Sequence, residues 1–109
     1  MPPRTTDVIQ GTLDLLILKS VSLVPLHGFG IARRIEQVSD GVFRVNPGSL
    51  LLAFQRLERQ NLIEGEWRTS DNNRRARFYR LTPKGRRQLT TAERDWTARV
   101  AAMAKLLEV

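Results

Sequence analysis

The sequence predicts a mainly α-helical fold with one β-hairpin and a long C-terminal helix. Three observations support this fold class. Apolar residues recur at helical spacing in four segments, a turn-rich segment separates two short strand-like runs, and an Asn-Pro and a Thr-Pro pair mark helix starts. A chain of 109 residues is expected to form one small domain, and a second subunit would help it to bury apolar surface.

The first two helices are expected near the N-terminus. Helical spacing predicts the first over residues 8–23, with Thr6 or Asp7 as the candidate N-cap, and Pro25 ends it. Residues 26–30 contain two glycines and are expected to form a short connection. A short second helix ends at a Ser-Asp-Gly turn, and its apolar stripe consists of Ile31, Ile35 and Val38.

The third helix is expected to start at Asn46-Pro47, because Asn is a good N-cap and proline is tolerated in the first turn. It is expected to end near Gln60. Four apolar residues at positions i, i+3, i+4 and i+7 would form its buried face: Leu50, Ala53, Phe54 and Leu57.

A β-hairpin is expected after the third helix. Residues 62–67 and 76–81 read as its strands, and the turn chemistry of Ser70-Asp71-Asn72-Asn73 lies between them. Because side chains alternate along a strand, Tyr79 and Leu81 are expected to face the core.

The final helix is expected to start at Thr82-Pro83 and to carry an apolar stripe at three-four spacing. A helix of about 25 residues, rising about 1.5 Å per residue, outruns a three-helix domain. The stripe either folds back onto the monomer's own core or, as we expect, is covered by a second copy. The residues expected at this dimer interface are Leu89, Trp96, Val100, Met103 and Leu107.

The positive charge of the chain is concentrated in one segment. The net charge of the chain is +7, and residues 68–87 alone hold eight basic residues against one acidic residue. The rest of the chain is therefore neutral overall. Such a concentration is typical of a surface that binds a polyanion. The alternative is that basic residues on an exposed strand edge protect it from aggregation.

Three short helices followed by a basic hairpin are the layout of a winged helix-turn-helix, in which the third helix enters the major groove of DNA. The free face of this helix would present Gln and Arg, which pair with adenine and guanine, and leucines, which can meet thymine methyl groups. The alternative for this face is an ordinary solvated helix surface. The residues expected to contact DNA are Ser49, Leu51, Leu52, Gln55, Arg56 and Arg59 on the helix and Arg74, Arg75 and Arg77 on the hairpin.

The sequence offers no pattern for catalysis or metal binding. It has no cysteine and a single histidine, His27, and it contains no nucleophile elbow, P-loop or dinucleotide-binding motif. We therefore expect no enzyme activity, no metal and no cofactor, and a structural role for His27. Polar residues interrupt the apolar N-terminal segment, which fits neither a membrane span nor a signal peptide, so we expect a cytoplasmic protein.

Several residue groups occur in an order that is more specific than any one of them: Gly11-Thr12-Leu13-Asp14-Leu15-Leu16-Ile17-Leu18, Leu26-His27-Gly28-Phe29-Gly30-Ile31, Gly48-Ser49-Leu50, Arg56-Leu57-Glu58, and Arg77-Phe78-Tyr79-Arg80-Leu81-Thr82-Pro83-Lys84-Gly85. Together they resemble the PadR family of transcriptional regulators over nearly the whole chain. The resemblance implies a winged helix-turn-helix DNA-binding domain over residues 1–82 and a C-terminal dimerisation helix over residues 83–109, as in the short subgroup of the family. It also implies a repressor that an effector or signal releases.

One position departs from the family pattern. Members typically carry Tyr-Pro after Gly-Ser-Leu, where this chain has Leu51-Leu52. The family tyrosine is expected to contact the DNA backbone, and Leu51 cannot donate that hydrogen bond. The basic hairpin, in contrast, is intact.

We therefore expect a homodimer that places two copies of the third helix on a near-palindromic operator in double-stranded DNA and represses by occluding the promoter. The alternative is a winged-helix protein-interaction module in which Leu51 and Leu52 bind an apolar partner. A pocket for a small-molecule effector would lie near Trp96, between the winged domain and the terminal helix, although a packing role is favoured for Trp96 itself.

Overall fold

The computed structural model describes residues 6–69 and 72–109, with side chains from residue 11 onward. Its elements are α1 (Thr6–Leu23), β1 (Leu26–His27), α2 (Gly28–Val38), α3 (Pro47–Arg59), β2 (Ile63–Thr69), β3 (Arg75–Leu81) and α4 (Pro83–Glu108). This is the predicted order of three helices, a hairpin and a long helix. Ser70 and Asp71 of the predicted turn lie outside the described residues. The helix α1 begins at Thr6, so both candidate N-caps, Thr6 and Asp7, lie within the helix instead of before it.

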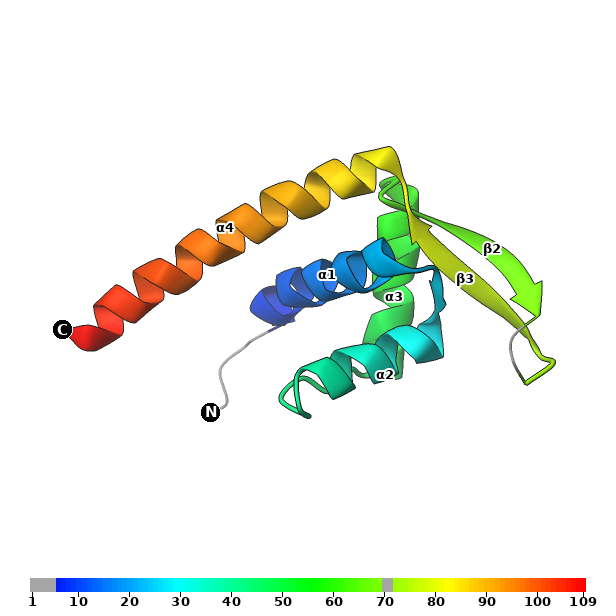
Figure 1. Ribbon diagram of the computed structural model, residues 1–109, viewed down its shortest axis with the longest axis horizontal. Coiled ribbons are helices and arrows are strands. Elements are labelled where there is room, and N and C mark those ends of the chain that lie inside the picture. The colour runs from blue at the N-terminus through cyan, green and yellow to red at the C-terminus, as the bar shows by residue number, and fades with distance from the viewer. Residues whose placement is uncertain (1–5, 70–71) are drawn as a thin grey trace.

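The helix α1 forms the centre of the molecule and contacts α2, α3, α4 and β3 (Figure 1). Three antiparallel strands in the order β1-β3-β2 form a small sheet beside the helices. The hairpin of β2 and β3 extends away from the helices as the wing, and α4 runs back along α1 and beyond it. The molecule is therefore elongated, with extents of 54 × 32 × 22 Å.

The segment expected to be a loop over residues 26–30 is instead a short strand followed directly by α2. Leu26 and His27 pair with Tyr79 and Phe78 of β3. His27 then caps α2, because its Nδ1 accepts a hydrogen bond from the backbone N–H of Gly30 at 3.0 Å. Hydrophobic periodicity cannot reveal a strand of two residues, and histidine is not among the preferred caps.

The buried face of α3 is the one predicted from its spacing. Asn46 caps the helix through its Oδ1, which accepts hydrogen bonds from the backbone N–H groups of Gly48 at 2.8 Å and Ser49 at 3.2 Å. Leu50, Ala53, Phe54 and Leu57 are all buried. The Phe54 ring stacks on Tyr79 of β3 with 4.5 Å between ring centroids. The core thus joins α3 to the sheet.

Two predicted core positions are more exposed than their spacing suggested. Leu81 is half-buried rather than buried, although Tyr79 on the same strand face is buried as predicted. Val38 was expected to continue the stripe of Ile31 and Ile35 but is 74% exposed. It is the last residue of α2, where the helix has already passed the end of the core.

The first turn of α4 is fixed to the turn that joins α3 to β2. The Thr82 hydroxyl accepts a hydrogen bond from the N–H of Gly85 at 2.9 Å and donates one to the carbonyl of Asn61 at 2.6 Å. The Lys84 ammonium donates to the carbonyl of Gln60 at 3.0 Å. Gly85 is buried directly against the carbonyl group of Leu62. These contacts set the direction in which α4 leaves the winged domain.

Gly85→Ala should therefore destabilise the fold. An added Cβ would overlap the Leu62 carbonyl oxygen and lie 2.8 Å from its carbon, and backbone cannot yield as a flexible side chain can. We expect the free energy of unfolding in urea to fall by about 1–3 kcal/mol, the range of overpacked sites. Gly11→Ala in α1 is the matched control, because no atom lies within 4 Å of its added Cβ. It should raise stability by about 0.5–1 kcal/mol, and equal stability of the two variants would refute the tight approach.

Candidate nucleic-acid interface

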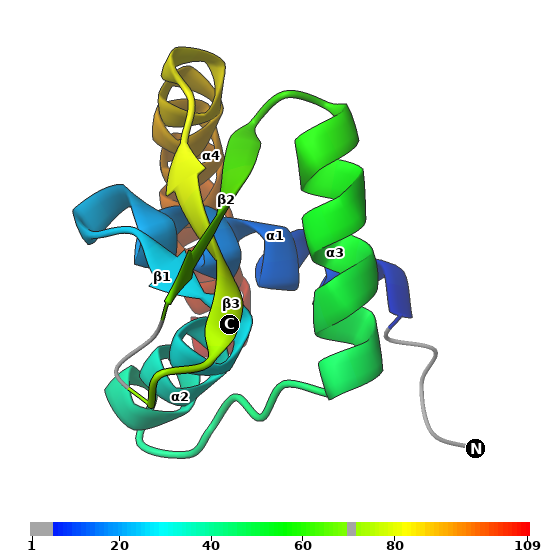
Figure 2. The ribbon, with the colours of Figure 1, turned by 90° about the vertical axis from the view of Figure 1, so that its right-hand side faces the viewer.

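The free face of α3 is open to solvent. Ser49, Leu51, Leu52, Gln55 and Arg59 are all exposed, as the sequence predicted for the side opposite the buried stripe. Figure 2 shows α3 at one side of the molecule, with the hairpin beside it and no other element over its outer side. Leu51 and Leu52 are 54% and 62% exposed, so this face carries two adjacent apolar side chains. This face is available to a partner.

Arg56 lies at the flank of α3 rather than on its free face. It is half-buried and forms an ion pair with Asp14 of α1. Burial raises the pKa of the Asp14 carboxyl above its ordinary value, although the hydrogen bond and the charge of Arg56 act in the opposite direction. The pair fastens α3 to α1. Spacing along α3 placed Arg56 on the surface correctly, but it could not show that α1 brings a carboxylate there.

The arginines of the wing fall into two groups. Arg74 and Arg75 are exposed near its tip. Arg77 is half-buried and forms a forked ion pair with Glu58 of α3, in which its Nη2 and Nε lie 2.9 and 3.4 Å from the two carboxylate oxygens. Hydrogen bonding to Glu58 raises the pKa of Arg77 above its ordinary value. Arg77 therefore links the wing to α3.

The wing carries less uncompensated charge than its sequence indicated. Arg80 pairs with Glu64 at 2.7 Å, and Arg68 pairs with Glu66 at 3.3 Å. These glutamates and Glu58 precede residue 68, so they fell outside the basic segment defined along the chain. The antiparallel register brings Glu64 opposite Arg80. Within the side chains that the structure describes, the exposed cations without such a carboxylate partner include Arg59, Arg74 and Arg75.

Trp67 also belongs to this surface, although it was not among the residues predicted from the sequence. It is 55% exposed on β2, and the guanidinium carbons of Arg75 and Arg77 lie 5.4 and 5.7 Å from its ring centroid. Both are cation–π distances. One feature of the sequence could have indicated its position. Side chains alternate along β2, so Trp67 lies on the same face of the strand as Ile63, which is buried.

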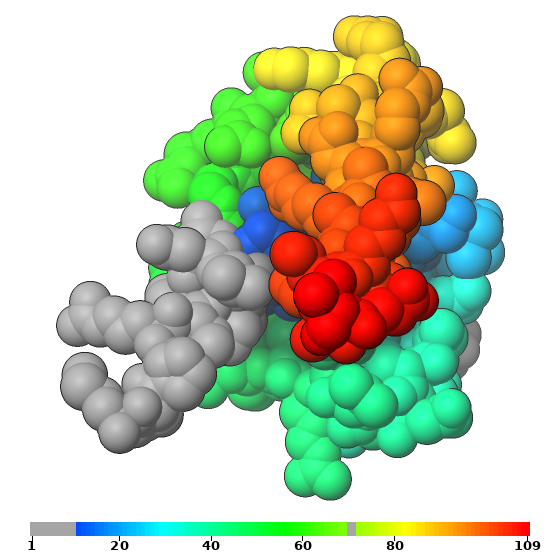
Figure 3. Space-filling model, turned by 90° about the vertical axis from the view of Figure 1, so that its left-hand side faces the viewer, coloured from blue at the N-terminus to red at the C-terminus, as the bar shows by residue number. Residues whose placement is uncertain are grey.

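A second exposed surface runs along α4. Leu89 is buried against the winged domain, but Trp96, Val100, Met103 and Leu107 are between 41% and 78% exposed. Figure 3 views the molecule from the end of α4 and shows its last turns standing in front of the other elements. The stripe does not fold back onto the monomer's core beyond Trp96, so a long apolar helix face is left uncovered.

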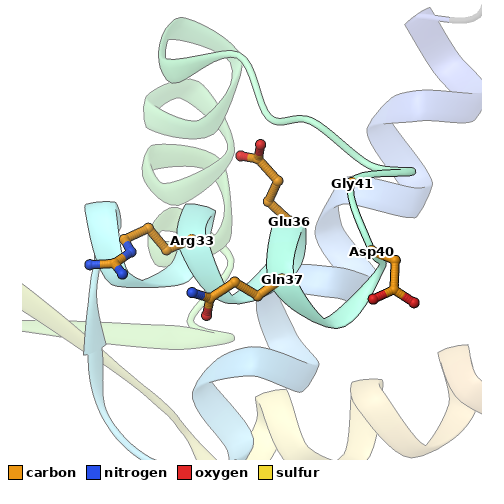
Figure 4. A pocket seen from close by; sticks show the side chains of 5 residues that line it. All are labelled: Arg33, Glu36, Gln37, Asp40 and Gly41. Carbon is orange, nitrogen blue, oxygen red and sulfur yellow. The ribbon is translucent and has the colours of Figure 1, made fainter.

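Two hollows matter for ligand binding. One lies on α2 and holds about 470 Å³, but the side chains that line it, Arg33, Glu36, Gln37 and Asp40, point apart rather than toward a common ligand (Figure 4). The other holds about 490 Å³ and is mainly apolar, with walls from α1, the loop before α3, the start of α3 and Trp96. It lies where the sequence suggested an effector pocket.

The described residues offer no site for a metal ion: residues 6–69 and 72–109 contain no group of three or more His, Cys, Asp or Glu side chains that could hold one. Likewise, none of the helices in those ranges is both long and apolar enough to cross a membrane.

The chain is similar to known transcriptional regulators in both sequence and fold. The model of the transcriptional regulator PadR-like family matches residues 17–91. A transcriptional regulator of Mycobacterium tuberculosis is 41% identical over 85 residues, which are 78% of this chain and 76% of that protein. Two solved structures have the same fold: a transcriptional regulator from Clostridium thermocellum (TM-score 0.82, 25% identity, 96% of this chain and 97% of that one) and a PadR family transcriptional regulator from Eggerthella lenta (TM-score 0.77, 27% identity, 96% and 89%).

Arg56→Ala should destabilise the fold, whereas Arg59→Ala on the same helix should not. Removing Arg56 leaves the Asp14 carboxylate without its partner. The two side chains are 24% and 26% exposed. We therefore expect the free energy of unfolding to fall by about 1–2 kcal/mol, less than for a fully buried ion pair. Arg59→Ala should stay within about 0.5 kcal/mol of the wild type.

Urea unfolding at several pH values measures both variants. The loss caused by Arg56→Ala should shrink as the pH falls through the pKa of Asp14, because a protonated carboxyl group no longer needs a cation. A loss independent of pH in the acid range would show that Arg56 acts through packing instead of through this ion pair.

Proposed function

The chain belongs to the PadR-like family of transcriptional regulators, and we propose that it acts as a homodimeric, sequence-specific DNA-binding repressor. The observation that carries this proposal is the open face of α3, which lies beside a wing with exposed arginines at its tip. The family is one of transcriptional regulators rather than enzymes.

In this proposal α3 enters the major groove, which is wide enough for a helix. Gln55 and Arg59 read base edges, Gln55 by pairing with adenine and Arg59 by pairing with guanine. Leu51 and Leu52 supply apolar contacts for thymine methyl groups, and the Ser49 hydroxyl at the start of the helix donates a hydrogen bond to the DNA backbone. The exposure of all five side chains supports these roles.

Arg74 and Arg75 of the wing are proposed to contact phosphates, which bind arginine through forked hydrogen bonds. We assign Arg56 and Arg77 a different role from the direct DNA contact that the sequence suggested. Both are engaged in ion pairs within the chain, with Asp14 and Glu58. They hold α3 and the wing in place, so their effect on DNA binding is indirect.

The proposed dimer forms through α4, by burial of the stripe of Trp96, Val100, Met103 and Leu107. These four side chains are substantially exposed in the single chain, where they would favour aggregation if left uncovered. Leu89, which the sequence placed in the same interface, is instead already buried in the core of the winged domain. Residues 1–82 then act as the DNA-binding unit and residues 83–109 as the dimerisation helix. These two ranges differ in proposed role but are not separate folding units, since Leu89 of α4 packs into the core of the winged domain.

A two-fold dimer presents two copies of α3 to half-sites about one helical turn apart, so the operator is expected to be nearly palindromic. Binding there would repress by occluding the promoter. An effector, if the protein responds to one, would fit the apolar hollow beside Trp96, because that hollow touches both the dimerisation helix and the start of α3.

One observation favours the alternative of a protein-interaction module: two adjacent exposed leucines, Leu51 and Leu52, on the free face. Such a module would bind its partner mainly through apolar contacts. Titration of duplex DNA at several salt concentrations separates the two functions, because phosphate contacts make log Kd change linearly with log salt. Absence of salt-dependent DNA binding would favour the module.

Gln55→Ala and Arg59→Ala should each change the preferred base at a few operator positions while lowering nonspecific affinity little, since base contacts specify and phosphate contacts position. Each lost pairing should reduce discrimination against the wrong base by about 1–3 kcal/mol. Selection of bound sequences from a random duplex pool measures this effect. Gln37→Ala, at an exposed glutamine of α2, is the control and should select the wild-type sequence. Unchanged selection by both α3 variants would contradict base reading by this face.

Met103→Glu should disrupt the proposed dimer, because a charge in the middle of the α4 stripe cannot be buried without a partner. We expect sedimentation to show monomers at micromolar concentration, with a helical spectrum like that of the wild type. Ala101→Glu is a matched control, since it introduces the same charge two residues away, on the other side of the exposed helix. A dimer that tolerates Met103→Glu but not Ala101→Glu would place the interface on the opposite face.

A further inference from the structure

A continuous set of contacts connects α3 to the tip of the wing. It starts at Glu58 on α3, which binds the guanidinium of Arg77 on β3 at 2.9 Å. Arg77 lies over the ring of Trp67 on β2, and Arg75 lies over the same ring, at centroid distances of 5.7 and 5.4 Å. The four side chains therefore form a stack that runs along one face of the hairpin.

The strand register explains why these side chains meet. Trp67 is directly opposite Arg77, and Thr69 is opposite Arg75. Because positions two apart on a strand share a face, Arg75, Arg77 and Trp67 lie on the same face of the hairpin, where both guanidinium groups come within cation–π distance of the indole.

Gly65 provides the space through which Arg77 reaches Glu58. A Cβ at this position would lie 2.7 Å from Cζ and 2.8 Å from Nη2 of Arg77, which is closer than real Cβ atoms approach. A larger residue would have to displace the guanidinium, which is the far end of a flexible side chain. The glycine therefore leaves room for the forked pairing of Arg77 with Glu58.

Charge also orders the stack. Two guanidinium groups beside one ring repel each other, so a bare Arg–Trp–Arg arrangement would tend to open. Glu58 balances the charge of Arg77, which lets both arginines remain on the electron-rich indole. The neighbouring Arg74 lies over none of the aromatic rings in the described residues.

We propose that Glu58, Arg77 and Trp67 are positioning residues that hold Arg75 on the indole, so that Arg75 meets a DNA phosphate in register with α3. The inference rests on the proposed function, and it adds residues that the DNA does not need to touch. An arginine loses much rotamer freedom when it is fixed at an interface, so ordering Arg75 before binding raises affinity. The stack also ties the wing arginine to the helix that reads the bases.

A double-mutant cycle tests the proposal by duplex-DNA titration on the selected operator. Trp67→Leu should weaken binding about two- to fivefold, the size of a cation–π contact at a partly exposed site. Trp67→Phe, which keeps an aromatic face, should bind within about twofold of the wild type. In an Arg75→Ala background Trp67→Leu should have no further effect, since contacting residues couple. In an Arg74→Ala background, the matched control, it should keep its full effect.

Two further measurements separate positioning from direct contact. Arg75→Ala should flatten the slope of log K against log salt by about 0.9, the value for one lost phosphate contact. Trp67→Leu removes no charge, so it should change that slope less while still lowering affinity.

The outcomes are distinct. If Trp67→Leu weakens binding equally with Arg75 present and absent, or if Trp67→Phe fails to rescue, the stack does not position Arg75 and the inference is wrong. If the wild type shows no salt-dependent binding to DNA, the proposed function fails, and this inference fails with it. Far-ultraviolet circular dichroism confirms that each variant is folded, which is expected because Trp67 is 55% exposed.

Discussion

The stacking of Phe54 on Tyr79, with 4.5 Å between the ring centroids, ties the two elements that are proposed to contact DNA to one core. Phe54 is the inward residue of α3, and Tyr79 is the buried residue of β3, so the helix and the wing cannot move independently at this point. The polar stack from Glu58 to Arg75 continues the same connection along the surface. Because interiors are close-packed, a small displacement of either ring changes the angle between α3 and the wing.

Local signals in the sequence predicted most of the fold. Asn46-Pro47 and Thr82-Pro83 begin helices because their capping and first-turn chemistry is local, and the four buried residues of α3 follow from spacing alone. The strand β1 could not be predicted, since its two residues are a strand only through pairing with β3. The exposure of Val38 also depends on where the core ends, which no local pattern contains.

The candidate DNA-binding residues show a similar limit. Burial patterns identified which side of α3 is free, and five of the six predicted α3 residues lie exposed there. Charge counted along the chain could not reveal which arginines are already paired. Arg56 and Arg77 pair with carboxylates 42 and 19 residues away in sequence. Because of these ion pairs, neither guanidinium group is free, and both connect elements of the fold. Long-range pairing thus separates supporting arginines from contacting ones.

The position of α1 gives the proposed dimer a mechanical consequence. On one side α1 packs against α4, where Lys19 and Glu93 pair at 3.3 Å, and on the other it holds α3 through Asp14 and Arg56. In a dimer joined by α4, the separation of the two α3 helices is therefore transmitted through α1 in each subunit. DNA fixes that separation at about one helical turn. A ligand in the hollow beside Trp96 would act where these helices meet, so a change in the angle between them would displace α3.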